Sequence, residues 1–360
     1  MTIECDVLVV GGGPAGSSAA FFSKYFDKEN NYKVLLLERL PEEKYSAYHD
    51  ICGCCISQQT FKEINPIKPT NIIENIKNIK EYVGDQYIWK YKINGYIIDR
   101  PKFFRGILNR YKKMDGIFKQ ARVTDVEQQK EIIKIKTDKN ETIRTKFLIA
   151  ADGANSIIRK QFKIGENHKT LTIQYIVNEE PEHESLKFYY DEKFKGDYKY
   201  IFPNGSTTRI GFPLIKGQKN DIDGKIIKKQ TRVIGCGGIK NYILNNILFI
   251  GDAAGQTNIL SKGGIRPGMY AGKKAAEALV VHNNPKKYEE DWKKTGFHNE
   301  KLIEVFQKIK KMNNKELLDH YEPFEGNNKI SGLLKTAIFK KYSKYRDIYD
   351  AYMDLEKYGW

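Results

Sequence analysis

The segment Val7–Ala20, VLVVGGGPAGSSAA, constrains the fold of this chain more than any other part of the sequence. An apolar run with strand character leads into a glycine-rich turn, and small residues with helical character follow. Gly11, Gly13 and Gly16 have G-x-G-x-x-G spacing, which allows a tight turn, close approach of a pyrophosphate, and close packing of helix on strand. We therefore predict a dinucleotide at the N-terminus of this helix, where free N–H groups and the helix dipole favour negative charge.

A second apolar run supports this prediction. Lys33 to Glu38, KVLLLE, has strand character and ends in a carboxylate, at the place where such βαβ units accept hydrogen bonds from a ribose. The alternative is a glycine-rich turn that binds nothing, and the βαβ context makes it the weaker interpretation. Glu38 is therefore a candidate cofactor ligand.

The composition is that of a globular protein with a basic surface. The chain has 360 residues, of which 40% are hydrophobic and 29% charged, so that two domains with substantial cores are expected. The net charge of +16 suits an anionic partner, which would be a phospholipid surface, a phosphorylated substrate or nucleic acid. The alternative is a solvated lysine-rich surface with no such partner.

The cysteines and the N-terminus indicate the compartment. Five cysteines, with Cys52, Cys54 and Cys55 bunched together, do not resemble the disulfide framework of a secreted domain. Glu4 and Asp6 stand where a signal peptide would need basic residues, and no apolar run approaches the ~18 residues that a membrane span needs. We expect a cytoplasmic protein, or one peripheral to a membrane.

The pattern of apolar and polar residues changes twice along the chain. Residues 1–80, 97–165 and 238–285 combine apolar strands with helical patterns and are predicted to form one discontinuous Rossmann-like domain. Residues 81–96 and 166–237 show short strands rich in aromatic and β-branched residues, which predicts a mostly antiparallel sheet. Residues 286–360 form a helical C-terminal segment, with patterns at Tyr288–Met312 and Lys335–Leu355. The predicted fold class is α/β (α+β).

Two further segments point to the same ligand. Phe147–Arg159, FLIAADGANSIIR, and Ile247–Gly255, ILFIGDAAG, are strands that end at Asp152 and Asp252 in glycine-rich turns. A carboxylate there can accept from ribityl hydroxyls, and the next helix N-terminus can face a pyrophosphate or the electron-rich edge of a reduced flavin. Both aspartates also suit ordinary turns or N-caps.

The set GGGPAG, AADGANS with Arg159, and IGDAAG followed by GGI resembles the FAD-dependent family built like p-hydroxybenzoate hydroxylase. Within it the chain resembles the geranylgeranyl reductases: Tyr198–Gly205, YKYIFPNG, is similar to their Y-x-W-x-F-P-x-G motif, with Tyr200 in place of Trp. Cys52-Gly53 with Ile56-Ser57 is similar to their C-G-x-x-(I/V)-S loop, to which Cys54 and Cys55 are additional. Arg100 with Phe103 and Leu108 is similar to R-x-x-F-D-x-x-L, with Phe104 in place of Asp.

Together the motifs and the resemblance imply a set of site residues. The residues expected to bind FAD are Gly11, Gly13, Pro14, Ala15, Gly16, Glu38, Arg39, Cys52, Gly53, Arg100, Val123, Asp152, Gly153, Asp252, Gly264 and Ile265. The residues expected to line an isoprenoid pocket are Tyr198, Tyr200, Phe202, Pro203 and Gly205, and Cys52 and Tyr198 are the candidate catalytic residues. Residues at i, i+2 and i+4 of a strand share a face, so Tyr198, Tyr200 and Phe202 would form an apolar wall, although ordinary sheet core is an equal interpretation from the pattern alone.

Three interpretations of the cysteine cluster stay open. A metal site lacks a matching C-x-x-C or histidine pair elsewhere. In the second interpretation a cysteine beside the flavin is a redox thiol, a proton donor or part of the pocket wall. In the third the cysteines are buried and inert. The candidate proton donors are Cys52, Tyr198 and a flavin-bound water, and the sequence does not choose among them.

The function implied by the resemblance is FAD-dependent reduction of C=C bonds in geranylgeranyl chains, most directly those of archaeal-type phospholipid precursors. Its expected partners are the isoprenoid lipid, an anionic membrane surface, and an electron donor such as ferredoxin, a reduced deazaflavin or NADPH, with no nucleic acid. The main alternative is a flavin-dependent monooxygenase of the aromatic hydroxylase type. A quinone-linked electron-transfer flavoprotein is weaker because no cysteine follows Cys236 to hold an iron–sulfur module, and a non-catalytic flavin or nucleic-acid binder has only the charge in its support.

Overall fold

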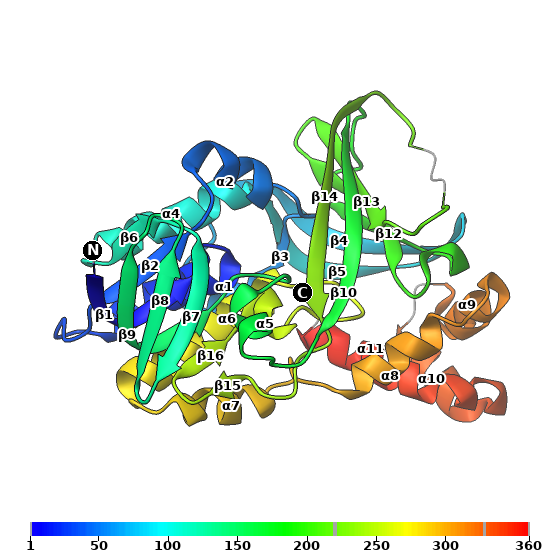
Figure 1. The fold of residues 1–360 in the computed structure, drawn as a ribbon. Coiled ribbons are helices and arrows are strands. Elements are labelled where there is room, and N and C mark those ends of the chain that lie inside the picture. The colour runs from blue at the N-terminus through cyan, green and yellow to red at the C-terminus, as the bar shows by residue number, and fades with distance from the viewer. Residues whose placement is uncertain (1, 219–221, 327–328, 359–360) are drawn as a thin grey trace.

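The computed structural model describes residues 2–218, 222–326 and 329–358. Two sheets lie side by side, and the C-terminal helices lie below the second sheet in the view of Figure 1. The predicted combination of a Rossmann-like part, a mostly antiparallel sheet and a helical C-terminal segment is confirmed.

The first sheet has a parallel centre in the order β15-β16-β9-β1-β2-β6. β7 and β8 form an antiparallel hairpin that pairs with the first half of β9. β1 and β2 are buried along their apolar runs, as expected for parallel strands covered on both faces. The strands are β1 (Thr2–Val10), β2 (Val34–Glu38), β6 (Ile117–Gln120), β7 (Val123–Gln129), β8 (Ile132–Thr137), β9 (Thr142–Ala150), β15 (Ile243–Leu244) and β16 (Ile247–Phe249).

Helices α1 and α6 pack closely together against this sheet. A Cβ atom on Gly272 of α6 would lie 2.4 Å from the carbonyl oxygen of Ala15 in α1, so only glycine permits this approach. The helices and helical turns of this half are α1 (Pro14–Phe26), α2 (Glu42–His49), α3 (Gln58–Glu63), α4 (Arg100–Lys112), α5 (Ile157–Gln161), η2 (Gly251–Ala254), α6 (Ile265–Ala276) and the π-helical η3 (Glu277–Val281).

The second sheet has the order β14-β10-β13-β12-β11-β4-β5-β3 and is antiparallel except where β11 runs parallel to β4. It begins earlier than residue 81, because β3 and the first part of β4 also belong to it. Register shifts at Ile72/Glu74 and Ile76/Asn78 break the period-two alternation of β4, which hides this strand in the sequence. The elements are β3 (Cys55–Ser57), β4 (Ile72–Val83), β5 (Gln86–Ile98), β10 (His168–Val177), β11 (Ser185–Tyr190), η1 (Glu192–Phe194), β12 (Tyr198–Asn204), β13 (Thr207–Pro213) and β14 (Ile226–Cys236).

The C-terminal segment is a set of short helices rather than the two long ones that its patterns indicate. A Cβ on Gly296, between α7 and α8, would lie 2.0 Å from the ring of Tyr358, so the chain bends where the last helix packs. No helix in the described ranges is both long and apolar enough to cross a membrane. The elements are α7 (Pro285–Lys293), α8 (Lys301–Ile309), α9 (Asn314–Tyr321), η4 (Glu322–Phe324), α10 (Lys329–Ile338), η5 (Lys340–Tyr345) and α11 (Arg346–Tyr358).

Candidate functional site

A continuous cavity of about 820 Å³ begins at the glycine-rich turn after β1 and ends at the C-terminal helices. Between them it passes β12 and the segment that carries Cys52, Cys54 and Cys55, which we call the cysteine loop. Every residue expected to bind FAD lines it except Gly16. Gly16 does not line the cavity but allows α1 to pack against the glycine turn, because a Cβ there would lie 1.8 Å from the carbonyl oxygen of Gly11. Gly11 itself has φ +106°, which favours glycine.

The two long helices that begin at the cavity leave their N-termini open to a ligand. Helix α1 starts after Gly13 and helix α6 after Gly264, and neither has a side-chain cap. Gly13, Gly264 and Ile265 all line the cavity. Two helix dipoles therefore direct positive potential into it from opposite parts of the sequence.

Glu38 lies at the end of β2 and is 4% exposed. Its carboxylate accepts from the N–H of Gly12 at 2.6 Å and from the N–H of Leu40 at 2.8 Å, and burial raises its pKa. Each oxygen keeps a lone pair, so the carboxylate is fixed beside the glycine turn with capacity for a ribose hydroxyl. Tyr45 locks the same turn by donating to the carbonyl of Gly12 at 2.8 Å.

Asp152 fits both of its predicted roles with different oxygens. One oxygen accepts from the N–H of Ile157 at 2.8 Å, which is the turn role, whereas the N-cap of α5 is Ser156. The other is buried and has no hydrogen-bond partner within the described part of the chain, and burial raises the pKa of this carboxyl. A buried acceptor that lines the cavity without a partner suits a ligand hydroxyl.

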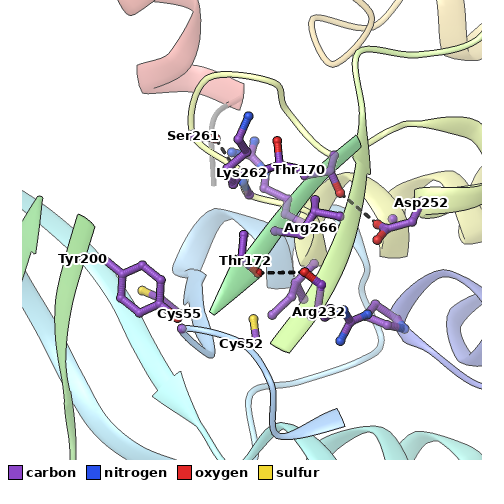
Figure 2. Close-up of a pocket in the computed structure, with 18 of the residues that line it drawn as sticks. Cys52, Cys55, Thr170, Thr172, Tyr200, Arg232, Asp252, Ser261, Lys262 and Arg266 are labelled. Atoms are coloured by element: carbon purple, nitrogen blue, oxygen red, sulfur yellow. Dashed lines mark hydrogen bonds between the residues drawn. The ribbon is translucent and has the colours of Figure 1, made fainter. Parts of the chain in front are cut away.

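Asp252 and Asp152 follow neighbouring strands, and Arg159 ties their loops together. The Asp252 carboxylate accepts from the Thr257 hydroxyl at 2.9 Å (Figure 2). The fully buried Arg159 donates to the carbonyls of Ala253 at 2.7 Å and Ala154 at 3.2 Å. Its place in the motif is therefore structural: it holds two cofactor loops in register.

A basic group of side chains surrounds the middle of the cavity. Arg100 is 3% exposed, donates to the carbonyl of His49 at 2.7 Å, and has an Nε without a partner among the described residues. Burial and the charges of Arg100 and Arg232 lower the pKa of His49 well below its ordinary value. His49, the last residue of α2, was not predicted, because a single histidine carries no pattern in the sequence. The neutral ring and the cations favour an anionic ligand here.

The cysteine loop is docked onto the second sheet by Arg209. This buried side chain of β13 donates to the carbonyls of Asp50 at 2.9 Å and Cys52 at 3.2 Å and pairs with the Asp50 carboxylate at 2.8 Å. A Cβ on Gly53 would lie 2.7 Å from the ring of Phe202, which explains the glycine after Cys52. The loop is thus fixed between the two sheets.

The three thiols of this loop all line the cavity, and none forms a disulfide. The Cys54 thiol donates to the carbonyl of Cys52 at 3.3 Å. Hydrogen bonding to the Cys54 side chain and the positive charges of Arg100 and Arg232 lower the pKa of Cys52, whereas burial raises that of Cys55. Across the described ranges no group of three or more His, Cys, Asp and Glu side chains is placed so that it could hold a metal ion.

The aromatic wall predicted on β12 lines the cavity. Tyr198, Tyr200 and Phe202 all face it, and Tyr200 lies beside the cysteine loop in Figure 2. Tyr200 donates to the Gln174 side chain at 2.8 Å, and Tyr198 donates to the carbonyl of Ser261. Pro203 and Gly205 lie outside the cavity lining, in the alternate position of the strand and in the turn after it.

The far end of the cavity is formed by residues without a sequence signal. Glu81 of β4 is 8% exposed and accepts from Trp89 at 2.5 Å and Tyr190 at 3.2 Å. Leu333, Tyr349, Tyr352 and Met353 of the C-terminal helices line this end. Long-range packing alone brings them together.

The comparisons with known proteins agree with this geometry. Residues 115–207 match a sequence family described as an FAD binding domain. A digeranylgeranylglycerophospholipid reductase from Methanococcus vannielii is 28% identical over 325 residues, which cover 80% of each chain. The crystal structure of a geranylgeranyl bacteriochlorophyll reductase-like protein from Thermoplasma acidophilum has a TM-score of 0.81 and 20% identity, over 96% of this chain and 100% of that one.

A p-nitrophenol 4-monooxygenase from Pseudomonas putida shares the fold more distantly, with a TM-score of 0.67 and 12% identity over 99% of this chain and 98% of that one. Fold, cavity and family match define an FAD-dependent oxidoreductase. Within that class the chain is similar to the geranylgeranyl reductases, in agreement with its sequence motifs.

Proposed function

We propose that this protein reduces the C=C bonds of geranylgeranyl chains, with phospholipid precursors of the archaeal type as its substrates. The observation that carries the proposal is the continuity of the cavity, which joins the dinucleotide turn to a long aromatic and aliphatic section. The reductase names of the relatives support the substrate class. The aromatic hydroxylase alternative is supported by a likeness of fold, such as that to the p-nitrophenol 4-monooxygenase at 12% identity.

Different residues of the cavity would bind the cofactor and position the substrate in such a reaction. When bound, reduced FAD supplies a hydride to one alkene carbon. We propose that the open N-termini of α1 and α6 and the unpartnered oxygen of Asp152 hold the cofactor. Tyr198, Tyr200 and Phe202 position the chain and exclude water, which fixes the reacting carbon in the cavity.

The second alkene carbon needs a proton, because an unactivated alkene is a poor hydride acceptor. Cys52 and Tyr198 remain the proposed donors, and both line the cavity. Burial raises the pKa of Tyr198, and its proton is engaged with the carbonyl of Ser261, so Tyr198 must break that bond before it can donate. The hydrogen bond with Cys54 and the charges of Arg100 and Arg232 lower the pKa of Cys52, and the same hydrogen bond and burial raise that of Cys54. Cys52 is therefore the stronger acid of the two thiols and gives up its proton more readily. Unchanged turnover in both Cys52→Ser and Tyr198→Phe would remove the two residues from this role.

The test is mass spectrometry of a geranylgeranyl phospholipid after anaerobic incubation with the chemically reduced, FAD-loaded protein. We expect mass gains in steps of two hydrogens, and none when the protein is kept oxidised. The variant Gly211→Ala on β13 should bind FAD but reduce the lipid more slowly, because its Cβ would lie 2.2 Å from the Tyr200 ring and would push that ring into the pocket. No mass gain, together with oxygen uptake stimulated by a phenol, would favour the hydroxylase.

We further propose a cytoplasmic protein that binds an anionic membrane surface and receives electrons from ferredoxin, a reduced deazaflavin or NADPH. The net charge of +16 supports the membrane partner. Vesicle binding should then weaken as salt is raised, because a Debye length of about 10 Å at 0.1 M shortens further. Stopped-flow reduction of the bound flavin by each donor in turn would identify the electron source.

A further inference from the structure

Helix α10 presents an apolar face that no described part of the chain covers. Ile330, Leu334 and Ile338 follow one another at helical spacing and are 74%, 57% and 72% exposed, and Phe339 directly after the helix is 51% exposed. Scattered single apolar residues on a surface are ordinary, but a contiguous row on one helix marks an interaction surface.

The opposite face of α10 is packed firmly. A Cβ on Gly332 would lie 2.4 Å from the ring of Phe324, so the helix is seated on η4 without a gap. The Phe324 ring in turn contacts that of Tyr349 in α11, with centroids 5.6 Å apart. The exposed row is therefore a fixed feature of the surface.

Basic side chains border the apolar row. Lys335, Lys340, Lys341 and Lys344 are all exposed, on α10 and the η5 turn that follows it. Lys341 pairs with Glu322 at 2.7 Å, which leaves the border with an excess of positive charge. An apolar face edged by lysines is the pattern of a helix that lies in the interface of an anionic bilayer.

The same helix forms part of the cavity wall. Leu333, next to Leu334 in sequence, lines the far end of the cavity. Met353 of α11 lines it as well and is 39% exposed, so the cavity wall reaches the molecular surface on these helices. A hydrocarbon chain that left a bilayer at α10 would meet the Leu333 and Met353 side chains at the end of the cavity rather than water.

We propose that α10 and η5 form the membrane-docking element of this protein, with the apolar row inserted at the surface of an anionic bilayer and the end of the cavity held against it. The proposal rests on the proposed function, since it assumes a lipid substrate. The net charge alone does not show which surface contacts the membrane, and the proposal assigns that contact to α10 and η5. In this arrangement the isoprenoid chain passes from bilayer to cavity along Leu333 and Met353.

The test compares the FAD-loaded protein with the triple variant Ile330→Ser/Leu334→Ser/Ile338→Ser by co-sedimentation with vesicles. Vesicles of phosphatidylcholine alone and with phosphatidylglycerol separate apolar from charge contributions. We expect the triple variant to partition at least about tenfold less, and Lys335→Gln/Lys340→Gln to lose about fivefold per lysine on anionic vesicles only. The matched control is Ile226→Ser/Ile227→Ser on β14, whose side chains are 48% and 56% exposed.

Equal binding of the triple variant and the wild type would overturn the proposal. So would a shift from dimer to monomer in light scattering without loss of vesicle binding, because the row would then be an interface between two copies. Lipid reduction is measured in parallel on detergent-dispersed and vesicle-embedded substrate, and the triple variant should lose turnover only on vesicles. Vesicle binding without reduction of either substrate would contradict the proposed function and leave the docking element standing.

Discussion

The pKa values of Cys52 and Cys54 are shifted in opposite directions, although the two residues are only two positions apart. The pKa of Cys52 is lowered, first by its hydrogen bond with Cys54 and then by Arg100 and Arg232, while the pKa of Cys54 is raised because loss of its proton would break that bond. Cys52 is therefore the more acidic of the two thiols, and Cys54 holds its proton more tightly. This distinction is invisible in the sequence, where both residues belong to one cluster.

Alkylation should separate the cysteines by pH. Because the thiolate is the reactive species and the pKa of Cys52 is lowered, its labelling by iodoacetamide should fall less steeply than that of Cys236 as the pH is reduced from 9 to 6.5. Burial raises the pKa of Cys236 to about 11, so its labelling should fall about tenfold for each pH unit below that value. Peptide mass spectrometry measures both rates in one sample. Cys54→Ser should slow the labelling of Cys52 at pH 6.5, and an equal pH dependence of Cys52 and Cys236 would contradict the assignment.

At the scale of elements, the seating of α1 on β1 depends on one glycine. Gly16→Ala should abolish FAD binding or weaken it by at least about 100-fold, because the new Cβ would lie 1.8 Å from a backbone oxygen and must displace the helix. Gly106→Ala is the control: this glycine of α4 has open space around it, and alanine should stabilise the helix by about 1 kcal/mol. Flavin fluorescence and thermal unfolding measure the two effects. A Gly16→Ala protein that binds FAD normally would refute this role.

The docking of the cysteine loop on β13 should appear in the pH dependence of stability. Arg209→Met should lower the free energy of unfolding at pH 7 by about 3 kcal/mol, since it leaves the half-buried Asp50 with only Lys228. Although burial opposes it, the pairing with Arg209 lowers the pKa of Asp50 in the folded state. A lowered carboxyl pKa gives stability that is complete above the unfolded value of about 3.9 and is lost as the pH falls through the folded value.

The difference between wild type and Arg209→Met should therefore be constant from pH 7 to about pH 5 and shrink below pH 4. Urea unfolding at a series of pH values measures it. Lys228→Met, which removes the more exposed partner, should cost less than about 1 kcal/mol at every pH. A difference that did not shrink in acid would mean that Arg209 acts through packing alone.

At the scale of the whole molecule, FAD binding should stabilise the entire fold. Its lining comes from both sheets, the cysteine loop and the C-terminal helices. FAD at 100 times its dissociation constant should raise the free energy of unfolding by about 2.7 kcal/mol. Riboflavin should stabilise far less at the same concentration, because it cannot reach the glycine turn at Gly11. Calorimetry of the apoprotein with each compound measures this, and equal stabilisation would place the binding energy away from the turn.

Site residues whose roles depend on near neighbours in the sequence could be predicted, and those whose partners lie far along the chain could not. The glycine turn, Glu38 and the two aspartate loops are set by local spacing, and the structure places all of them on one cavity. His49 and Arg209 have no local pattern: their roles arise from partners 51 and 159 residues away. Pro203 and Gly205 were expected in the pocket from their motif, but strand alternation and the following turn place them outside its lining.

By itself the sequence determined the FAD-binding fold, because glycine spacing and buried apolar strands act over a few residues and admit few alternatives. It also determined that Tyr198, Tyr200 and Phe202 share a face, since a strand alternates with period two. Only the tertiary structure decided that this face opens into a cavity rather than a solid core, and that the cavity ends at α10 and α11. Those outcomes depend on which distant surfaces pack together, and packing between remote segments leaves no periodic mark in the chain.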